Sequence, residues 1–133
     1  MSGARLLVVD DDPASCEAVA EGLRAEGFDV TTAFGGTDAL TRVRESVFDI
    51  VLSDVRMRDL DGLALLRTLR RDTPDLCVIL MTAFANVEAA LTAIQEGAYD
   101  YVSKPLRLDE LLLTIRRALA QLQLARENRR FRE

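Results

Sequence analysis

Histidine is absent from this sequence of 133 residues, which removes the commonest general base and the commonest zinc ligand from consideration. Any chemistry in the chain must therefore use carboxylates, hydroxyls and lysine. Cysteine is scarce, because Cys16 and Cys77 are the only two and lie far apart, each within an apolar pattern. We expect both to be buried, reduced thiols rather than a disulfide or a metal-binding pair.

Long hydrophobic runs are also missing. Runs such as 6–9 and 78–81 are far shorter than the roughly 20 residues needed to cross a bilayer. The N-terminal run ends at once in three aspartates, 10–12, and not in a secretory cleavage site. We therefore expect a cytoplasmic protein without a membrane span. The formal net charge of −5, with no dense Lys/Arg patch, argues against direct nucleic-acid binding by this segment, since such binding depends on neutralising phosphates.

The length of the chain fits one ordinary domain. Its residues form a repeating pattern of strand-like and helical segments. Five short β-rich runs alternate with segments whose apolar residues recur at helical spacing. The runs are Arg5–Val9, Phe28–Ala33, Ile50–Asp54, Cys77–Met81 and Tyr99–Ser103. The first, third and fourth are nearly continuous hydrophobic runs, which is expected when helices cover both faces of a parallel sheet. The sequence therefore predicts a doubly wound α/β domain with five strands and five helices.

The last predicted helix begins after Lys104-Pro105 and continues past the point where the domain needs it. Its apolar residues recur at spacings of four and three, at Leu108, Leu112, Ile115, Leu119 and Leu122. The segment 121–133 is polar and arginine-rich and has no stop signal. We expect a domain at residues 1–120, and at 121–133 an extension of the fifth helix that begins a linker to an output domain outside this sequence.

Polar residues follow four of the predicted strands at their carboxyl ends, where parallel α/β sheets bind ligands. They are Asp10 and Asp11 after the first strand, Asp54 at the end of the third, Thr82 after the fourth and Lys104 after the fifth. If the first and third strands are adjacent, three carboxylates meet in one crevice, where their repulsion is costly without a cation. All-oxygen ligation suits Mg²⁺, with Mn²⁺ as the alternative.

A carboxylate beside a divalent cation, with a hydroxyl and an ammonium group near it, matches the requirements of phosphoryl transfer. Asp54 is the candidate nucleophile. Thr82 can donate a hydrogen bond to a phosphoryl oxygen, and Lys104 can pair with the phosphoryl group or with Asp54 itself. These three residues form the candidate reactive group.

Each of these residues also has an ordinary structural explanation. Asp12 is better explained as a helix N-cap than as a ligand, because Pro13 follows it. Taken alone, Asp54 could be a turn residue, Thr82 a helix N-cap and Lys104 an exposed charge. Their occurrence together at the ends of several strands favours a site over these separate explanations.

Four fragments in this order resemble the receiver domain of bacterial two-component response regulators. They are Leu7-Val8-Val9-Asp10-Asp11-Asp12, Ser53-Asp54 with Met57 and Asp61-Gly62, Met81-Thr82-Ala83, and the stretch from Gly97 to Pro105. The likeness covers about residues 4–120. It implies a flavodoxin-like three-layer sandwich with strand order 2-1-3-4-5.

The resemblance also implies a role for each matching residue. Asp54 corresponds to the phosphoacceptor, which receives a phosphoryl group from a sensor histidine kinase. Asp11 corresponds to the direct metal ligand and Asp10 to a carboxylate that holds the metal through water. The backbone carbonyl of Arg56 should supply a further ligand. Mg²⁺ is the cation that the resemblance implies.

A second set of implied roles concerns the switch. Thr82 and Lys104 correspond to the residues that detect the phosphoryl group. Tyr101 corresponds to an aromatic residue whose ring turns inward when the threonine moves. Pro105 corresponds to a proline that follows the lysine through a cis bond.

The sequence departs from the family pattern at one position. Arg58 stands where the family usually has proline, and we expect it to loosen the loop after Asp54 without touching a ligand. Arg56 and Phe84 lie at the positions where the family tunes the lifetime of the phosphate.

The stretch from Met81 to Tyr101 looks most like receivers of the nitrogen-regulation class, which drive sigma-54-dependent AAA+ activators. Expected partners are therefore a sensor kinase and a transcriptional output domain on the same chain, with DNA contact made outside this segment. A homodimer is a further hypothesis, either through the helix around 87–94, the strand Tyr99–Ser103 and the last helix, or through the extension 121–133.

The resemblance predicts a switch that catalyses its own phosphorylation and slow dephosphorylation and is not otherwise an enzyme. One alternative is an aspartate-nucleophile phosphatase, which typically carries a second Asp two residues after the nucleophile, where this sequence has Arg56. A pseudo-receiver normally lacks one of the acidic or lysine positions, and none is missing here. A stand-alone receiver that acts through protein contacts remains open.

Overall fold

A computed structural model describes residues 3–83 and 86–132. Its five strands form one parallel sheet in the order β2-β1-β3-β4-β5. The strands are β1 (Arg5–Val9), β2 (Asp29–Ala33), β3 (Ile50–Asp54), β4 (Cys77–Thr82) and β5 (Asp100–Ser103). Each predicted strand is present within one residue of its expected bounds, and the strand order that the resemblance implied is confirmed.

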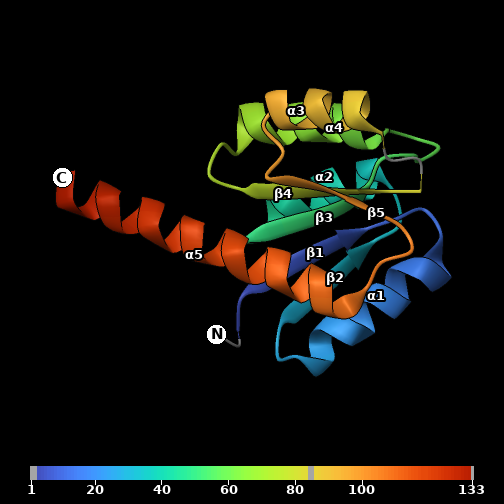
Figure 1. Ribbon diagram of the computed structural model, residues 1–133, viewed down its shortest axis with the longest axis horizontal. Helices are drawn as coiled ribbons and strands as arrows, with labels where there is room; N and C mark the ends of the chain where they lie inside the picture. Colours follow the sequence, from blue (N-terminus) through green and yellow to red (C-terminus); the bar gives the residue numbers. More distant parts are fainter. Residues whose placement is uncertain (1–2, 84–85, 133) are drawn as a thin grey trace.

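Five helices alternate with the strands and cover both faces of the sheet (Figure 1). They are α1 (Pro13–Ala25), α2 (Gly36–Glu45), α3 (Gly62–Asp72), α4 (Val87–Gln95) and α5 (Leu108–Arg132). The helices α1 and α5 pack on one face, and α2, α3 and α4 pack on the other. The predicted doubly wound, three-layer α/β architecture is therefore confirmed.

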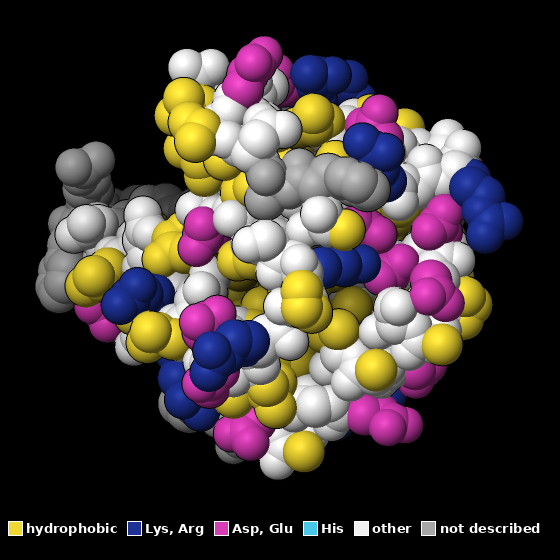
Figure 2. Space-filling model, turned by 45° about the vertical axis from the view of Figure 1, so that its right-hand side comes forward, with side chains coloured by type: hydrophobic (Ala, Val, Ile, Leu, Met, Phe, Trp, Pro, Cys, Tyr) yellow, Lys and Arg dark blue, Asp and Glu magenta, His cyan; other side chains and the backbone are white. Residues whose placement is uncertain are grey.

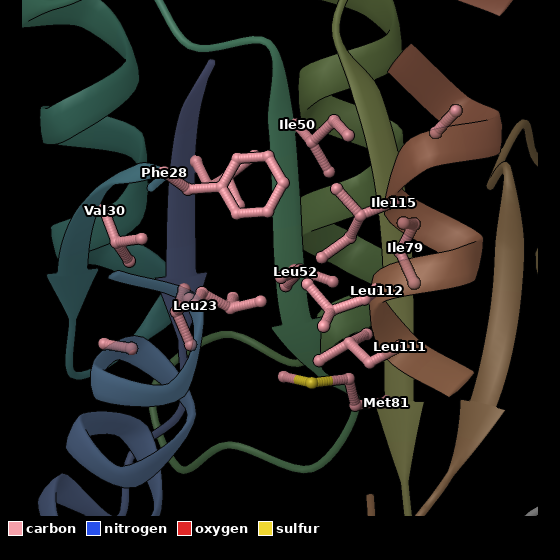
Figure 3. Packing of buried hydrophobic residues seen from close by; sticks show 14 of the residues in the cluster. Leu23, Phe28, Val30, Ile50, Leu52, Ile79, Met81, Leu111, Leu112 and Ile115 are labelled. Carbon is pink, nitrogen blue, oxygen red and sulfur yellow. The ribbon is translucent and has the colours of Figure 1, made fainter. Parts of the chain in front are cut away.

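The strand β1, which lies between β2 and β3, supplies residues to a hydrophobic core on each face. Leu6 and Val8 belong to the core under α1 and α5, whereas Leu7 and Val9 belong to the core under α2, α3 and α4. All four are 0% exposed, which explains why this strand is a continuous hydrophobic run in the sequence. Figure 3 shows the first core, where side chains of α1, β3 and α5 meet.

Both cysteines lie in the first core, as expected. Cys16 is on α1 and Cys77 begins β4. Burial raises the pKa of the Cys16 thiol to about 11 and that of the Cys77 thiol to about 12. The prediction of two reduced, buried thiols is confirmed.

The start of α1 agrees with its predicted cap. The Asp12 carboxylate caps α1 by accepting hydrogen bonds from the Ala14 backbone N–H (3.2 Å) and the Ser15 hydroxyl (2.8 Å), and Pro13 is the first helical residue. Gly27 has a φ of +96° after α1, a conformation that favours glycine. The Asp12 cap fixes where α1 starts, directly beyond the acidic residues that follow β1.

The helix α5 is 25 residues long and leaves the body of the domain toward its C-terminal end (Figure 1). Leu119 and Leu122 still pack against the first core. Arg126 reaches back to Asp49, with 3.1 Å between Nη2 and Oδ1. The side chain of Phe131 lies outside the described residues. Within the described residues, no helix is both long and apolar enough to span a membrane.

Candidate functional site

Three carboxylates meet at the carboxyl ends of β1 and β3. Asp10 and Asp11 follow β1, Asp54 ends β3, and the two strands are hydrogen-bonded neighbours with Val9 opposite Ser53. One oxygen from each carboxylate lies within 4.8 Å of the others. The sequence predicted this meeting, because parallel neighbouring strands end at the same edge of the sheet.

Lys104 brings a positive charge into this group. Its Nζ lies 3.0 Å from Oδ2 of Asp10 and 3.3 Å from Oδ2 of Asp54. The backbone N–H of Lys104 donates to the Thr82 carbonyl (2.7 Å), which holds the loop after β5 against the end of β4. The peptide bond from Lys104 to Pro105 is cis, as the resemblance implied.

The buried Asp10 has donors on both oxygens. This residue is 3% exposed. Its Oδ1 accepts from the Asp12 backbone N–H (3.0 Å), and its Oδ2 accepts from Lys104. A buried carboxylate needs such partners, because taking a charge out of water is costly. Asp12 itself accepts a hydrogen bond from the Ala14 backbone N–H, so the prediction that it caps α1 is confirmed.

The charges of the group act on one another. Burial raises the pKa of the Asp54 carboxyl above its ordinary value, and the nearby Asp10 adds to this effect, while Lys104 opposes it. Burial would lower the pKa of the Lys104 ammonium, but its contacts with Asp10 and Asp54 outweigh burial and raise it. Lys104 is therefore a fixed cation at neutral pH, facing two carboxylates.

Thr82 and Tyr101 lie on the next two strands. Thr82 ends β4, one residue beyond Met81, which is the register partner of Asp54. It is 2% exposed. Tyr101 lies opposite Leu80 on the edge strand β5, where it is half-buried and packs against the second core. Phe84 lies outside the described residues.

The loop between β3 and α3 closes over the end of β3. The Val55 N–H donates to the Met81 carbonyl (3.0 Å), and the Gly62 N–H donates to the Val55 carbonyl (2.7 Å). A Cβ at Gly62 would lie 2.5 Å from the Asp54 carbonyl oxygen, so a side chain there would force the loop away. Arg56 lies in this loop and is exposed. The role of its carbonyl stays a prediction.

The expectation that Arg58 touches no ligand residue is wrong. Its backbone N–H donates to Oδ2 of Asp11 at 3.1 Å, and its Nε lies 3.5 Å from the same oxygen. The first contact exists because arginine has the backbone N–H that proline lacks. The loop is therefore fastened to Asp11 at the position where loosening was expected.

Asp59 was not among the residues predicted from the sequence. Its carboxylate accepts hydrogen bonds from the backbone N–H groups of Gly36 (3.1 Å) and Thr37 (3.0 Å), so it fastens the same loop to the start of α2. A Cβ at Gly36 would lie 2.7 Å from Leu60, which shows how closely the two segments approach. The glycine pair at 35–36 was the only local sign of this contact.

The model of the response regulator receiver domain family matches residues 6–116 of this chain. The chain belongs to this receiver domain family. It is 47% identical over 115 residues to the transcriptional regulatory protein ZraR of Salmonella typhimurium, covering 86% of this chain and 26% of that protein. The receiver thus spans about a quarter of the length of the curated relatives that it matches.

Two solved structures are similar to this receiver. The structure of NtrX from Brucella abortus superimposes with a TM-score of 0.91 at 37% identity, covering 97% of this chain and 29% of that one. The beryllofluoride-activated NtrC4 receiver domain dimer gives a TM-score of 0.84 at 33% identity, covering 89% of this chain and 98% of that one. The predicted likeness to receivers of the nitrogen-regulation class is confirmed. Receivers of this family are signalling modules of two-component systems.

Figure 2 shows the face turned toward the carboxyl ends of the strands, where acidic and basic side chains stand side by side. Of the predicted site residues, the structure brings Asp10, Asp11 and Asp54 close together and places Lys104 in contact with two of them.

Proposed function

We propose that this receiver is a phosphorylation-dependent switch in which Asp54 accepts a phosphoryl group from a sensor histidine kinase. The observation that carries the proposal is the position of Asp54 at a strand end, with the Lys104 ammonium 3.3 Å away and two further carboxylates within 4.8 Å. A carboxylate nucleophile with fixed positive charge beside it is the arrangement that phosphoryl transfer requires.

In the proposed reaction, an oxygen of Asp54 attacks the phosphorus of a phosphohistidine on the kinase. A P–O bond forms while the P–N bond breaks, and its electron pair stays on the imidazole, which takes up a proton. The donor must be another protein or another domain, because this sequence has no histidine. Lys104 can contact the phosphoryl oxygens once Asp54 carries the group. The receiver thus catalyses its own modification, and slow hydrolysis by water reverses it.

The three carboxylates also fit a divalent cation. A single ammonium contacts Asp10 and Asp54, which leaves the group short of positive charge, and every donor is an oxygen. Asp11, Asp54 and the Arg56 carbonyl would hold Mg²⁺ or Mn²⁺, with Asp10 acting through water. When bound, the cation supplies positive charge to the phosphoryl oxygens.

Thr82 and Tyr101 would report the modification. Thr82 lies one residue past the register partner of Asp54, and its hydroxyl would move toward the phosphoryl group to donate a hydrogen bond to it. That movement would open space near Tyr101 on the adjacent strand and shift the equilibrium of the surface formed by α4, β5 and α5. Arg56 and Phe84 would tune how long the phosphate persists.

The partner of this surface is proposed to be an output domain. The relative ZraR is named a transcriptional regulatory protein, and this chain matches only its receiver portion. We place the receiver at 1–120 and the beginning of a linker helix at 121–133, joined to a sigma-54-type AAA+ and DNA-binding output. A homodimer through α4, β5 and α5 or through the extension of α5 is part of this proposal, since a relative is a receiver dimer.

Incubation of the purified chain with acetyl phosphate and Mg²⁺ should add one acid-stable, hydroxylamine-labile phosphoryl group, detected by intact-mass spectrometry. Asp54→Asn and Asp54→Ala should abolish the addition, because no other residue is placed as its nucleophile. Asp38→Asn, which removes a partly exposed carboxylate on α2, is the matched control and should be modified like the wild type. An unchanged mass of the wild type would overturn the proposal.

A further inference from the structure

The loop from Val55 to Asp61 carries a second positive charge to the acidic group. Arg58 contacts Oδ2 of Asp11 twice, with its backbone N–H at 3.1 Å and its guanidinium Nε at 3.5 Å. The Arg58 side chain is 91% exposed, whereas that of Asp11 is 23% exposed. The guanidinium is therefore a solvent-exposed charge beside the partly buried carboxylate of Asp11.

The loop is held firmly enough to present this charge. Asp59, the next residue, binds the backbone N–H groups of Gly36 and Thr37 at the start of α2. Arg58 is thus fixed through its own N–H on one side and through Asp59 on the other. Both attachments are made without the guanidinium, so the charge of Arg58 is separable from the position of the loop.

We propose that the Arg58 guanidinium sets the affinity of this acidic site for a divalent cation by competing with the cation for Asp11. The inference rests on the proposed function, because it concerns the cation that phosphorylation of Asp54 would require. With Lys104 alone, three carboxylates keep two negative charges, and with Arg58 in contact they keep one. A cation entering the group also meets repulsion from the guanidinium at short range.

The consequence is a site that fills only at a higher cation concentration than its carboxylates alone would need. Because Arg58 is exposed, salt screens its charge, and its effect should be largest at low ionic strength. The backbone N–H acts in the opposite sense, since it holds Asp11 in place for any residue except proline.

The test measures binding of Mn²⁺ to the full chain by electron paramagnetic resonance at low ionic strength. Arg58→Gln keeps the backbone N–H and removes the charge, and should bind Mn²⁺ roughly three- to tenfold more tightly than the wild type. Arg58→Lys keeps the charge and should stay nearer the wild type. Arg71→Gln is the matched control with the same change of charge.

Arg71 suits this control because it pairs with Asp72 in the last turn of α3, which runs away from Asp54 toward the start of β4. Its replacement should leave the Mn²⁺ affinity unchanged. Thermal unfolding checks that each variant is folded, as is expected for exposed side chains.

Equal affinities of Arg58→Gln and Arg71→Gln would overturn the inference and leave the proposed function standing. Weaker binding by Arg58→Gln would also overturn it, since the guanidinium would then support Asp11 rather than compete for it. A wild-type chain that binds no Mn²⁺ would overturn both the inference and the proposed cation site.

Discussion

At the scale of single residues, Lys104 supplies positive charge that offsets the negative charges of Asp10 and Asp54. It is the one positive charge in contact with the buried Asp10 among the described residues, and it also contacts Asp54. A buried carboxylate that loses its cationic partner is strongly destabilising, because its desolvation is no longer offset. The stability of the apo domain should therefore depend on this lysine.

Lys104→Met should lower the free energy of unfolding by about 1–3 kcal/mol without divalent cations, and Mg²⁺ should restore part of this loss. Urea unfolding with and without Mg²⁺ measures both effects. Arg107→Met removes an exposed cation that is paired with Asp109, and should cost less than about 1 kcal/mol. Equal losses in the two variants would show that Lys104 does not offset buried charge.

Single residues of the site were predictable where they end a strand or directly follow one. Asp10, Asp54 and Lys104 are examples, because the end of a hydrophobic run fixes their place at the sheet edge. The contacts of Arg58 and Asp59 were not predictable, since they depend on where a loop crosses the molecule. Asp59 binds the backbone of Gly36, which is 23 positions earlier in the sequence. No local spacing of residues indicates a contact between segments so far apart.

The loop after β3 and the helix α2 are coupled elements. Backbone hydrogen bonds from the start of α2 lower the pKa of the Asp59 carboxyl from its ordinary value of 3.8 to about 2. A carboxyl whose pKa is lower in the folded state stabilises the fold above its unfolded pKa, and this contribution is lost as the pH falls through the folded pKa. The coupling should therefore weaken between about pH 4 and pH 2.

Asp59→Ala should lower the free energy of unfolding at pH 7 by about 1 kcal/mol, the usual cost of losing a capping carboxylate. The difference between wild type and variant should shrink as the pH is lowered through the window above. Parallel urea titrations at several pH values measure it. A difference that stays constant down to pH 2 would mean that the ionised carboxylate contributes nothing.

The helix α4 exposes a row of apolar side chains. Val87 is 76% exposed, Leu91 57% and Ile94 46%. Among the described residues of this helix, Ala93 is the one that is buried. Single exposed apolar residues are common, but a row on one helix is typical of an interaction surface. The proposed output surface includes this helix.

Leu91→Glu should therefore abolish self-association of the beryllofluoride-treated chain, measured by sedimentation velocity. The charge would be buried in any interface through α4. Val47→Glu, at a 78% exposed position in the loop between α2 and β3, is the control and should associate like the wild type. If both variants associate equally, α4 is not the contact surface.

At the scale of elements, strand positions were predictable because β1, β3 and β4 are buried on both faces and have polar residues only toward their ends. The strand order came from the resemblance, since alternation of strands and helices fits several orders. The extent to which the end of α5 is held by the domain was also outside the reach of the sequence, because it depends on Leu122 and on the Arg126 contact with Asp49.

The whole molecule places the reactive group and the proposed output surface on the same part of the sheet. Asp54 ends the central strand β3, Thr82 ends its neighbour β4, and Tyr101 lies on the edge strand β5 beside them. In the proposed switch, a change at Asp54 would reach α4 and α5 across two adjacent strands. Tightly packed cores on both faces would then favour two discrete arrangements over gradual deformation.

The most direct test of the switch is the structure of the chain with beryllofluoride, which mimics the acyl phosphate, and Mg²⁺. We predict a group bound at Asp54, Thr82 moved toward it, and the Tyr101 ring turned inward. A complex in which Asp54 carries the group while Thr82 and Tyr101 keep their present positions would contradict the proposed switch.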